Sequence, residues 1–178
     1  MARELLRTIN EARKDPFYDS IFRAPHCILN NSITNSRRFA AQSFSLDRIR
    51  AICNAFGTTV NDVIMAMCAA ALRSYLLSQY ELPDKPLIAM VPVSLRRDDG
   101  EEGNQVGVIL ASLFTHLSDP AERLPRIHDG VKTEKERFLA MSSEEAINYT
   151  GLTLAPAAFN LLTGLAPKWQ TFNVVISN

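Results

Sequence analysis

The 178-residue chain lacks the short motifs that mark nucleotide, metal or serine-hydrolase chemistry. It has no GxGxxG or GxxxxGKS/T loop to cradle phosphates, and no GxSxG turn to present a nucleophilic serine. The three histidines are far apart in sequence, and no HxxxH, HExxH or cysteine–histidine spacing occurs. We therefore expect neither a bound metal nor another cofactor.

An excess of charge of either sign is also absent, because 19 basic residues balance 19 acidic ones. Such a chain has no net field that would recruit nucleic acid. The cysteines, Cys27, Cys53 and Cys68, are odd in number and form no CxxC pair, so we expect buried thiols in a reducing cytosol. The first sixteen residues have no apolar centre and do not resemble a secretory signal.

Long apolar runs predict an α/β arrangement with buried strands. The near-continuous runs 87–95 and 105–117 are typical of strands covered on both faces. A looser alternation predicts a strand at 37–44, and the final residues TFNVVISN predict another. The sequence stops inside that last strand, which favours interpretation of the chain as a truncated piece of a longer protein.

Helices are predicted between these strands. Ser45 is a suitable N-cap for a helix that ends at Gly57. The strongest helical pattern covers 58–80, and its apolar stripe is expected to face the core: Val60, Val63, Ile64, Met67, Cys68, Ala71, Leu72, Tyr75 and Leu76. A charged helix is predicted after Asp119-Pro120. The uncharged run 146–167 fits a buried helix, a lipid-contacting surface or the lining of an acyl tunnel, whereas its polar residues argue against a membrane span.

Two polar residues, Asn61 and Asp62, interrupt the apolar start of the 58–80 helix. Thr59 and Asp62 have the spacing of a capping box, which explains Asp62 structurally. The cap does not explain Asn61, whose amide needs hydrogen-bonding partners if it is buried. His128 is followed by Asp129 and Gly130, but we expect it near the solvated edge of its helix.

Four segments together resemble one known family, in order and with compatible spacing. They are SRRFAAQSFSLDRIRAI, TVNDVIMAMCAAALRSYL, PLIAMVPVSLRRDD and NVVISN. They resemble the bacterial wax ester synthase/diacylglycerol acyltransferase family. The resemblance implies part of a two-lobed CoA-dependent acyltransferase fold, like that of chloramphenicol acetyltransferase, with mixed sheets and packed helices. The charged loop 96–104 is the expected lobe boundary, so 1–100 would belong to the first lobe and 101–178 to the second.

The same resemblance implies transfer of a fatty acyl group from acyl-CoA to diacylglycerol or a long-chain alcohol. The family's general base is a histidine in an HHxxxDG motif, and the 178 residues contain no such motif. We therefore expect no catalytic residue in this chain, and a base supplied by the remainder of the same polypeptide. By resemblance, Asn61 and Asp62 support the site, while Arg96, Arg97 and Asn104 are candidates for contact with CoA phosphates.

The resemblance further implies a cytoplasmic protein, with possible peripheral contact to a membrane or to lipid inclusions. Two other readings stay open. The chain could be a non-catalytic lipid- or CoA-binding protein, or it could share the fold while using another acceptor.

Overall fold

The protein is described by a computed structural model that covers residues 24–31, 34–94, 106–163 and 170–177. It is a mixed α/β structure in which three strands form one sheet in the order β2-β1-β3. The elements, in chain order, are η1 (Ile28–Asn30), α2 (Leu46–Phe56), α3 (Val60–Ser78), β1 (Ile88–Ser94), β2 (Val106–Ser112), α4 (Pro120–Leu139), α5 (Ser143–Thr163) and β3 (Val174–Val175). The expected α/β class is confirmed.

The sheet joins segments from both halves of the chain. β1 pairs with β2 in antiparallel register from Ile88 opposite Ser112 to Ser94 opposite Val106, and with β3 in parallel. The two apolar runs therefore form strands, as predicted. The proposed lobe boundary at 96–104 falls between two paired strands of this sheet, and the loop itself lies outside the described residues.

β1 contains a proline, Pro92, which lies past the residues that pair with β3. The backbone groups of Ile88 and Met90 bond toward β3, since Asn173 and Ile176 donate their N–H groups to the carbonyls of Ile88 and Met90. Backbone groups alternate in direction along a strand, so Pro92 also faces that side. Proline has no N–H to donate at this point, and the described β1–β3 ladder ends with the bond to Met90.

Two predicted strands differ from the structure. β2 ends at Ser112 instead of continuing to 117, because Phe114 adopts a left-handed conformation with φ of 45° that cannot continue a strand. Residues 37–44 form no strand, and Phe39 there is 92% exposed. Among the described residues, no strand pairs with that segment and no core side chain covers Phe39.

α3 is capped as the sequence predicts, and its buried side is wider than the predicted stripe. Thr59 and Asp62 form the reciprocal capping box. Most of the predicted stripe faces the core: Val63 and Leu76 are buried, and Val60, Met67, Cys68 and Leu72 pack against buried residues. Tyr75 is the exception, at 50% exposed. The helix also buries Met65 and Ala69 outside the stripe, because most of its circumference is apolar and periodicity alone does not define how wide the buried side is.

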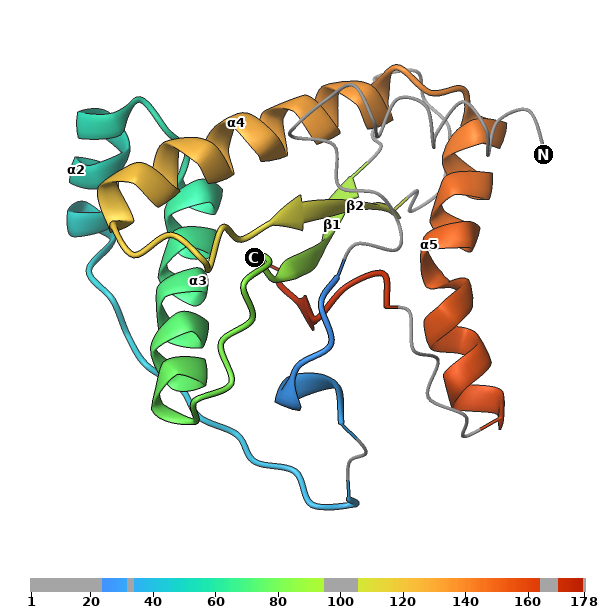
Figure 1. Cartoon of the computed structure of the whole chain (residues 1–178). Coiled ribbons are helices and arrows are strands. Elements are labelled where there is room, and N and C mark those ends of the chain that lie inside the picture. The colour runs from blue at the N-terminus through green and yellow to red at the C-terminus, as the bar shows by residue number, and fades with distance from the viewer. Residues whose placement is uncertain (1–23, 32–33, 95–105, 164–169, 178) are drawn as a thin grey trace.

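In Figure 1, α3, α4 and α5 lie around the sheet on three sides. α4 contacts both α3 and β2, and α5 contacts β2. Asp119 caps α4 and Pro120 opens it, as predicted. α5 spans residues 143–163 and continues through Pro156. Its first half is partly buried through Ala146, Tyr149 and Thr153, while Ile147, Phe159 and Leu162 are exposed.

A buried asparagine ties the start of the described chain to the sheet. The Asn173 side chain accepts a hydrogen bond from the Ile88 N–H (2.9 Å) and donates to the Pro25 carbonyl (2.7 Å) and to Asn30 Oδ1 (2.8 Å). Three segments separated by up to 148 residues therefore meet at one side chain.

α3 is also the one helix among the described residues that is long and apolar enough to cross a membrane. Core helices of globular proteins pass the same test, and Met65, Ala69 and Leu76 are completely shielded from solvent. Only 28% of its apolar window is buried, so we interpret α3 as a helix that packs one side against the core.

Candidate functional site

A cavity of about 580 Å³ lies where the first turn of α3, the middle of α4 and the strands β1 and β2 converge. Its wall is apolar toward the sheet and polar toward the helices. The lining residues are Thr59, Asn61, Asp62, Val91, Pro92, Val93, Ile109, His128, Val131, Lys132 and Lys135. An apolar cavity with a few converging polar groups is the usual form of a small-molecule site.

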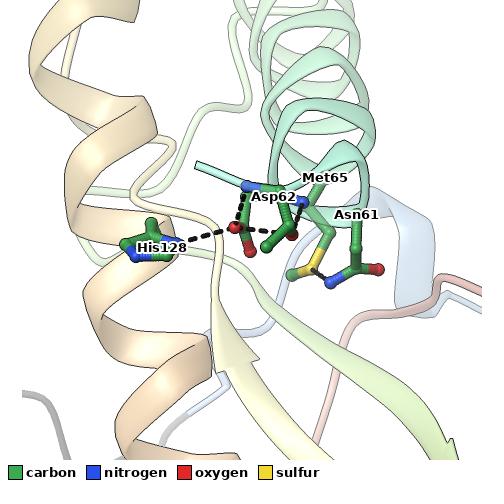
Figure 2. Close-up of polar contacts among 5 residues, drawn as sticks. Asn61, Asp62, Met65 and His128 are labelled. Carbon is green, nitrogen blue, oxygen red and sulfur yellow. Dashed lines mark hydrogen bonds and ion pairs between the residues drawn. The ribbon is translucent and has the colours of Figure 1, made fainter. Parts of the chain in front are cut away.

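Asp62 is the most buried polar group of the cavity, with 2% of its surface exposed. Its Oδ2 atom accepts hydrogen bonds from the Thr59 N–H (2.9 Å) and the Thr59 hydroxyl (2.7 Å). The same atom lies 2.7 Å from Nδ1 of His128 (Figure 2). A buried carboxylate requires such donors, because removing its charge from water is costly without them.

His128 reaches this carboxylate from α4. Its side chain is 25% exposed, which agrees with the expected position near the solvated edge of α4, but its ring also contacts a buried carboxylate. The sequence held a signal for this inward contact: His128 follows Leu124 by four residues and precedes Val131 by three, and both neighbours are buried. That spacing places all three on one face of α4.

The geometry assigns a tautomer to His128. An ionised carboxylate only accepts hydrogen bonds, so the proton of a neutral imidazole lies on Nδ1, facing Asp62. Within the part of the chain that the structure describes, Nε2 has no hydrogen-bonding partner and is not enclosed by protein. Nε2 is then available as an acceptor. An imidazole oriented by a carboxylate can accept a hydrogen bond or a proton from a hydroxyl group.

Asn61 lines the cavity beside Asp62 and is half-buried. Its amide nitrogen lies 3.7 Å from the Met65 sulfur, a weak acceptor, and its carbonyl oxygen makes no hydrogen bond to another described residue. The capping box does not use this side chain, as the sequence predicted. The structure thus brings the two predicted site residues, Asn61 and Asp62, to one cavity.

Two lysines extend the polar side of the cavity. Lys132 and Lys135 follow His128 on α4 at i+4 and i+7, so the three side chains form one stripe. Both lysines are exposed, and neither forms an ion pair with another residue in the described ranges. Sequence reasoning missed them because single lysines on a charged helix carry no motif. Arg96, Arg97 and Asn104 lie outside the described residues.

Titratable groups with perturbed pKa values lie elsewhere in the protein. Burial lowers the pKa of His116, and the nearby charges of Arg126 and Arg73 lower it further. Burial also raises the pKa of the Cys27 and Cys68 thiols. None of these residues lines the cavity. Among the described residues, no group of His, Cys, Asp and Glu could hold a metal ion.

Comparison with known proteins agrees with this architecture. Residues 1–64 match the sequence model of the wax ester synthase/diacylglycerol acyltransferase catalytic domain, and residues 102–178 match that of the WS/DGAT C-terminal domain. The chain is 48% identical over 98% of its length to an O-acyltransferase WSD of Acinetobacter baylyi, of which it covers 38%. It is 50% identical over 88% of its length to a putative diacylglycerol O-acyltransferase of Mycobacterium tuberculosis, of which it covers 36%.

A solved structure gives the same result. The chain is 60% identical to a wax ester synthase/diacylglycerol acyltransferase from Marinobacter aquaeolei VT8, with a TM-score of 0.75. The match covers 99% of this chain and 38% of that one. The chain thus spans little more than a third of the length of these relatives. Together, the two matched domains and these identities show that the chain belongs to the wax ester synthase/diacylglycerol acyltransferase family.

Proposed function

We propose that the chain is part of an O-acyltransferase of neutral lipid synthesis, which moves a fatty acyl group from acyl-CoA to diacylglycerol or a long-chain alcohol. The observation that carries this proposal is the match of both ends of the chain to successive domains of one acyltransferase family. The cavity between α3, α4 and the sheet supports it, because an apolar floor beside polar groups suits an acyl chain with a polar head.

The proposed chemistry is direct transfer assisted by a general base. A histidine removes the hydroxyl proton of the acceptor as the oxygen attacks the thioester carbon, and hydrogen-bond donors stabilise the negative oxygen that forms. Collapse of this intermediate expels the thiolate of CoA, which takes up the proton that the histidine removed, so the base returns to its neutral form. We assign the base to the HHxxxDG histidine of the family, a motif that the 178 residues do not contain.

Acyl-CoA would enter past the cationic side of the cavity. Lys132 and Lys135 provide two ammonium groups at its edge, and phosphate groups are natural ligands for such charges. Arg96, Arg97 and Asn104 remain proposed contacts for the same phosphates. In this arrangement the acyl chain lies along the apolar wall formed by Val91, Val93 and Ile109.

We also propose a cytoplasmic protein that contacts lipid surfaces peripherally. The exposed side chains of Ile147, Phe159 and Leu162 support this location, since they lie on the uncharged part of α5 that follows Glu145. The same residues could instead line an acyl tunnel completed by the remainder of the polypeptide. Flotation with phosphatidylglycerol vesicles distinguishes the two, because only the first requires vesicle binding without acyl-CoA.

The test of function uses the product of the complete reading frame that encodes these residues. Its ester formation from palmitoyl-CoA is measured with hexadecanol, with diacylglycerol and with short hydrophilic alcohols. We expect esters with the first two acceptors. Transfer only to hydrophilic alcohols would point to another acceptor class. Binding of palmitoyl-CoA without transfer to any acceptor would support a non-catalytic protein and contradict the proposal.

A further inference from the structure

The capping of α3 does not need the hydrogen bond between His128 and Asp62. The capping box is complete without it, since Thr59 and Asp62 already satisfy each other's backbone N–H groups. The imidazole belongs to another helix, 66 residues further along the chain. Its contribution is therefore a connection between two helices.

This connection lies at the point where α3 and α4 pack together. On one side of it, Val63 and Leu124 belong to a small apolar cluster with Cys53 of α2. On the other side is the cavity. Across the described residues, His128–Asp62 is the only side-chain hydrogen bond between α3 and α4. Apolar contacts tolerate sliding, whereas a hydrogen bond to a buried carboxylate fixes direction and distance.

The residue that this bond would hold in place is Asn61. It occupies the same first turn of α3 as Asp62, lines the cavity, and has only the Met65 sulfur as a hydrogen-bonding partner among the described residues. A carboxamide offers both donors and an acceptor. An amide lacking strong partners beside an apolar cavity is suited to the polar head of a bound molecule.

We propose that His128 is a positioning residue. Through its Nδ1–H bond to Asp62, it fixes the first turn of α3 against α4 and thereby places the Asn61 carboxamide at the cavity wall, where the carboxamide bonds the carbonyl or hydroxyl oxygen of the acyl substrates. The inference rests on the proposed acyltransferase function. It assigns to His128 a role that differs from proton abstraction.

Two substitutions separate this role from direct contact with a ligand. In His128→Asn the amide nitrogen occupies the position of Nδ1 and can still donate to Asp62. In His128→Gln the polar group lies at the position of Nε2 and leaves Asp62 without that donor. His128→Ala removes both groups. His116→Asn is the matched control, because His116 lies outside the cavity.

All variants are made in the product of the complete reading frame and assayed with palmitoyl-CoA and hexadecanol. We expect His128→Ala and His128→Gln to lose about tenfold or more in kcat/KM, the scale on which a misplaced contact acts. His128→Asn should stay within about threefold of the parent, and Asn61→Ala should lose activity as His128→Gln does. An active His128→Gln beside an inactive His128→Asn would overturn the proposal, as would equal loss in both or no loss in either.

A second readout does not depend on turnover. Nitrogen-15 shifts of labelled histidine report which ring nitrogen carries the proton. We expect the Nδ1–H form for His128 in the parent protein, and its loss in Asp62→Ala. An Nε2–H form in the parent would overturn the inference whatever the activity. Absence of acyl transfer in a parent protein with the expected tautomer would instead count against the proposed function alone.

Discussion

Nδ1 of His128 lies 2.7 Å from Oδ2 of Asp62, so that a side chain from the middle of α4 meets the first turn of α3 at the wall of a cavity. Asp62 receives two further hydrogen bonds from Thr59 at the same oxygen atom. The carboxylate therefore serves two purposes: it caps its own helix and binds a neighbouring one.

This double role predicts that Asp62→Asn destabilises the protein. The amide can present either its oxygen or its nitrogen to the donors around it but cannot satisfy all of them, and an unmade hydrogen bond in a buried position costs about 1–3 kcal/mol. We expect a loss of that size in the free energy of unfolding, measured by urea denaturation. Asp84→Asn, at an exposed site, is the control and should change stability little. Unchanged stability with lost turnover would show that Asp62 is more than a structural support.

Asn173 should matter for stability in a different way. Its side chain satisfies the Ile88 N–H and the Pro25 carbonyl at the junction of three segments. Asn173→Ala leaves these buried backbone groups without partners, so we expect the free energy of unfolding to fall by about 2 kcal/mol or more. Asn160→Ala, at an exposed position of α5, provides the comparison. Equal stability of the two variants would contradict this account of the junction.

The two lysines at the cavity edge predict a charge-dependent affinity for acyl-CoA. In the complete protein, Lys132→Glu combined with Lys135→Glu should raise the KM for palmitoyl-CoA several-fold at low salt and change kcat less. The difference from the parent should shrink as salt is added, because ionic screening weakens the attraction of exposed charges. Lys85→Glu, at an exposed site away from the cavity, should leave KM unchanged. If the control substitution raised the KM for palmitoyl-CoA as much as the double substitution does, a phosphate contact local to the two cavity lysines would be excluded.

The thiols should react slowly in the folded protein. Burial raises the pKa of Cys27 and Cys68, so each carries less thiolate at pH 8 than an ordinary thiol does. Alkylation by iodoacetamide should be slow at that pH and should accelerate as the pH rises through the raised values. Cys68 should react before Cys27, which is only 4% exposed. Mass spectrometry locates the modified residue, and urea should abolish the protection. Rapid native labelling of Cys27 would contradict its burial.

The sequence predicted those features that depend on local chemistry. The N-cap at Ser45, the end of α2 at Gly57, the Thr59–Asp62 capping box and the start of α4 at Asp119-Pro120 are confirmed, because each uses residues only a few positions apart. The two apolar runs were also predictable as strands. A strand that is apolar on both faces is buried on both, so its prediction does not depend on knowing which face meets the core.

Features that depend on distant partners were not predictable in the same way. No local pattern indicates that His128 would meet Asp62, or that Asn173 would bond Ile88 and Pro25. α3 has apolar residues on most sides, so the extent of its buried side depends on how it packs against the rest of the protein. The alternation at 37–44 suggested a strand, yet no neighbouring strand pairs with it in the described structure.

We propose that these residues bind and position acyl substrates, while the proton-abstracting histidine belongs to a motif that they do not contain. This division of roles is tested by comparing ester formation from palmitoyl-CoA and hexadecanol by the folded 178-residue chain and by the product of the complete reading frame. We expect turnover for the latter and none for the former, with folding of the former verified by circular dichroism. Esterification by the 178 residues unaided would contradict this proposal.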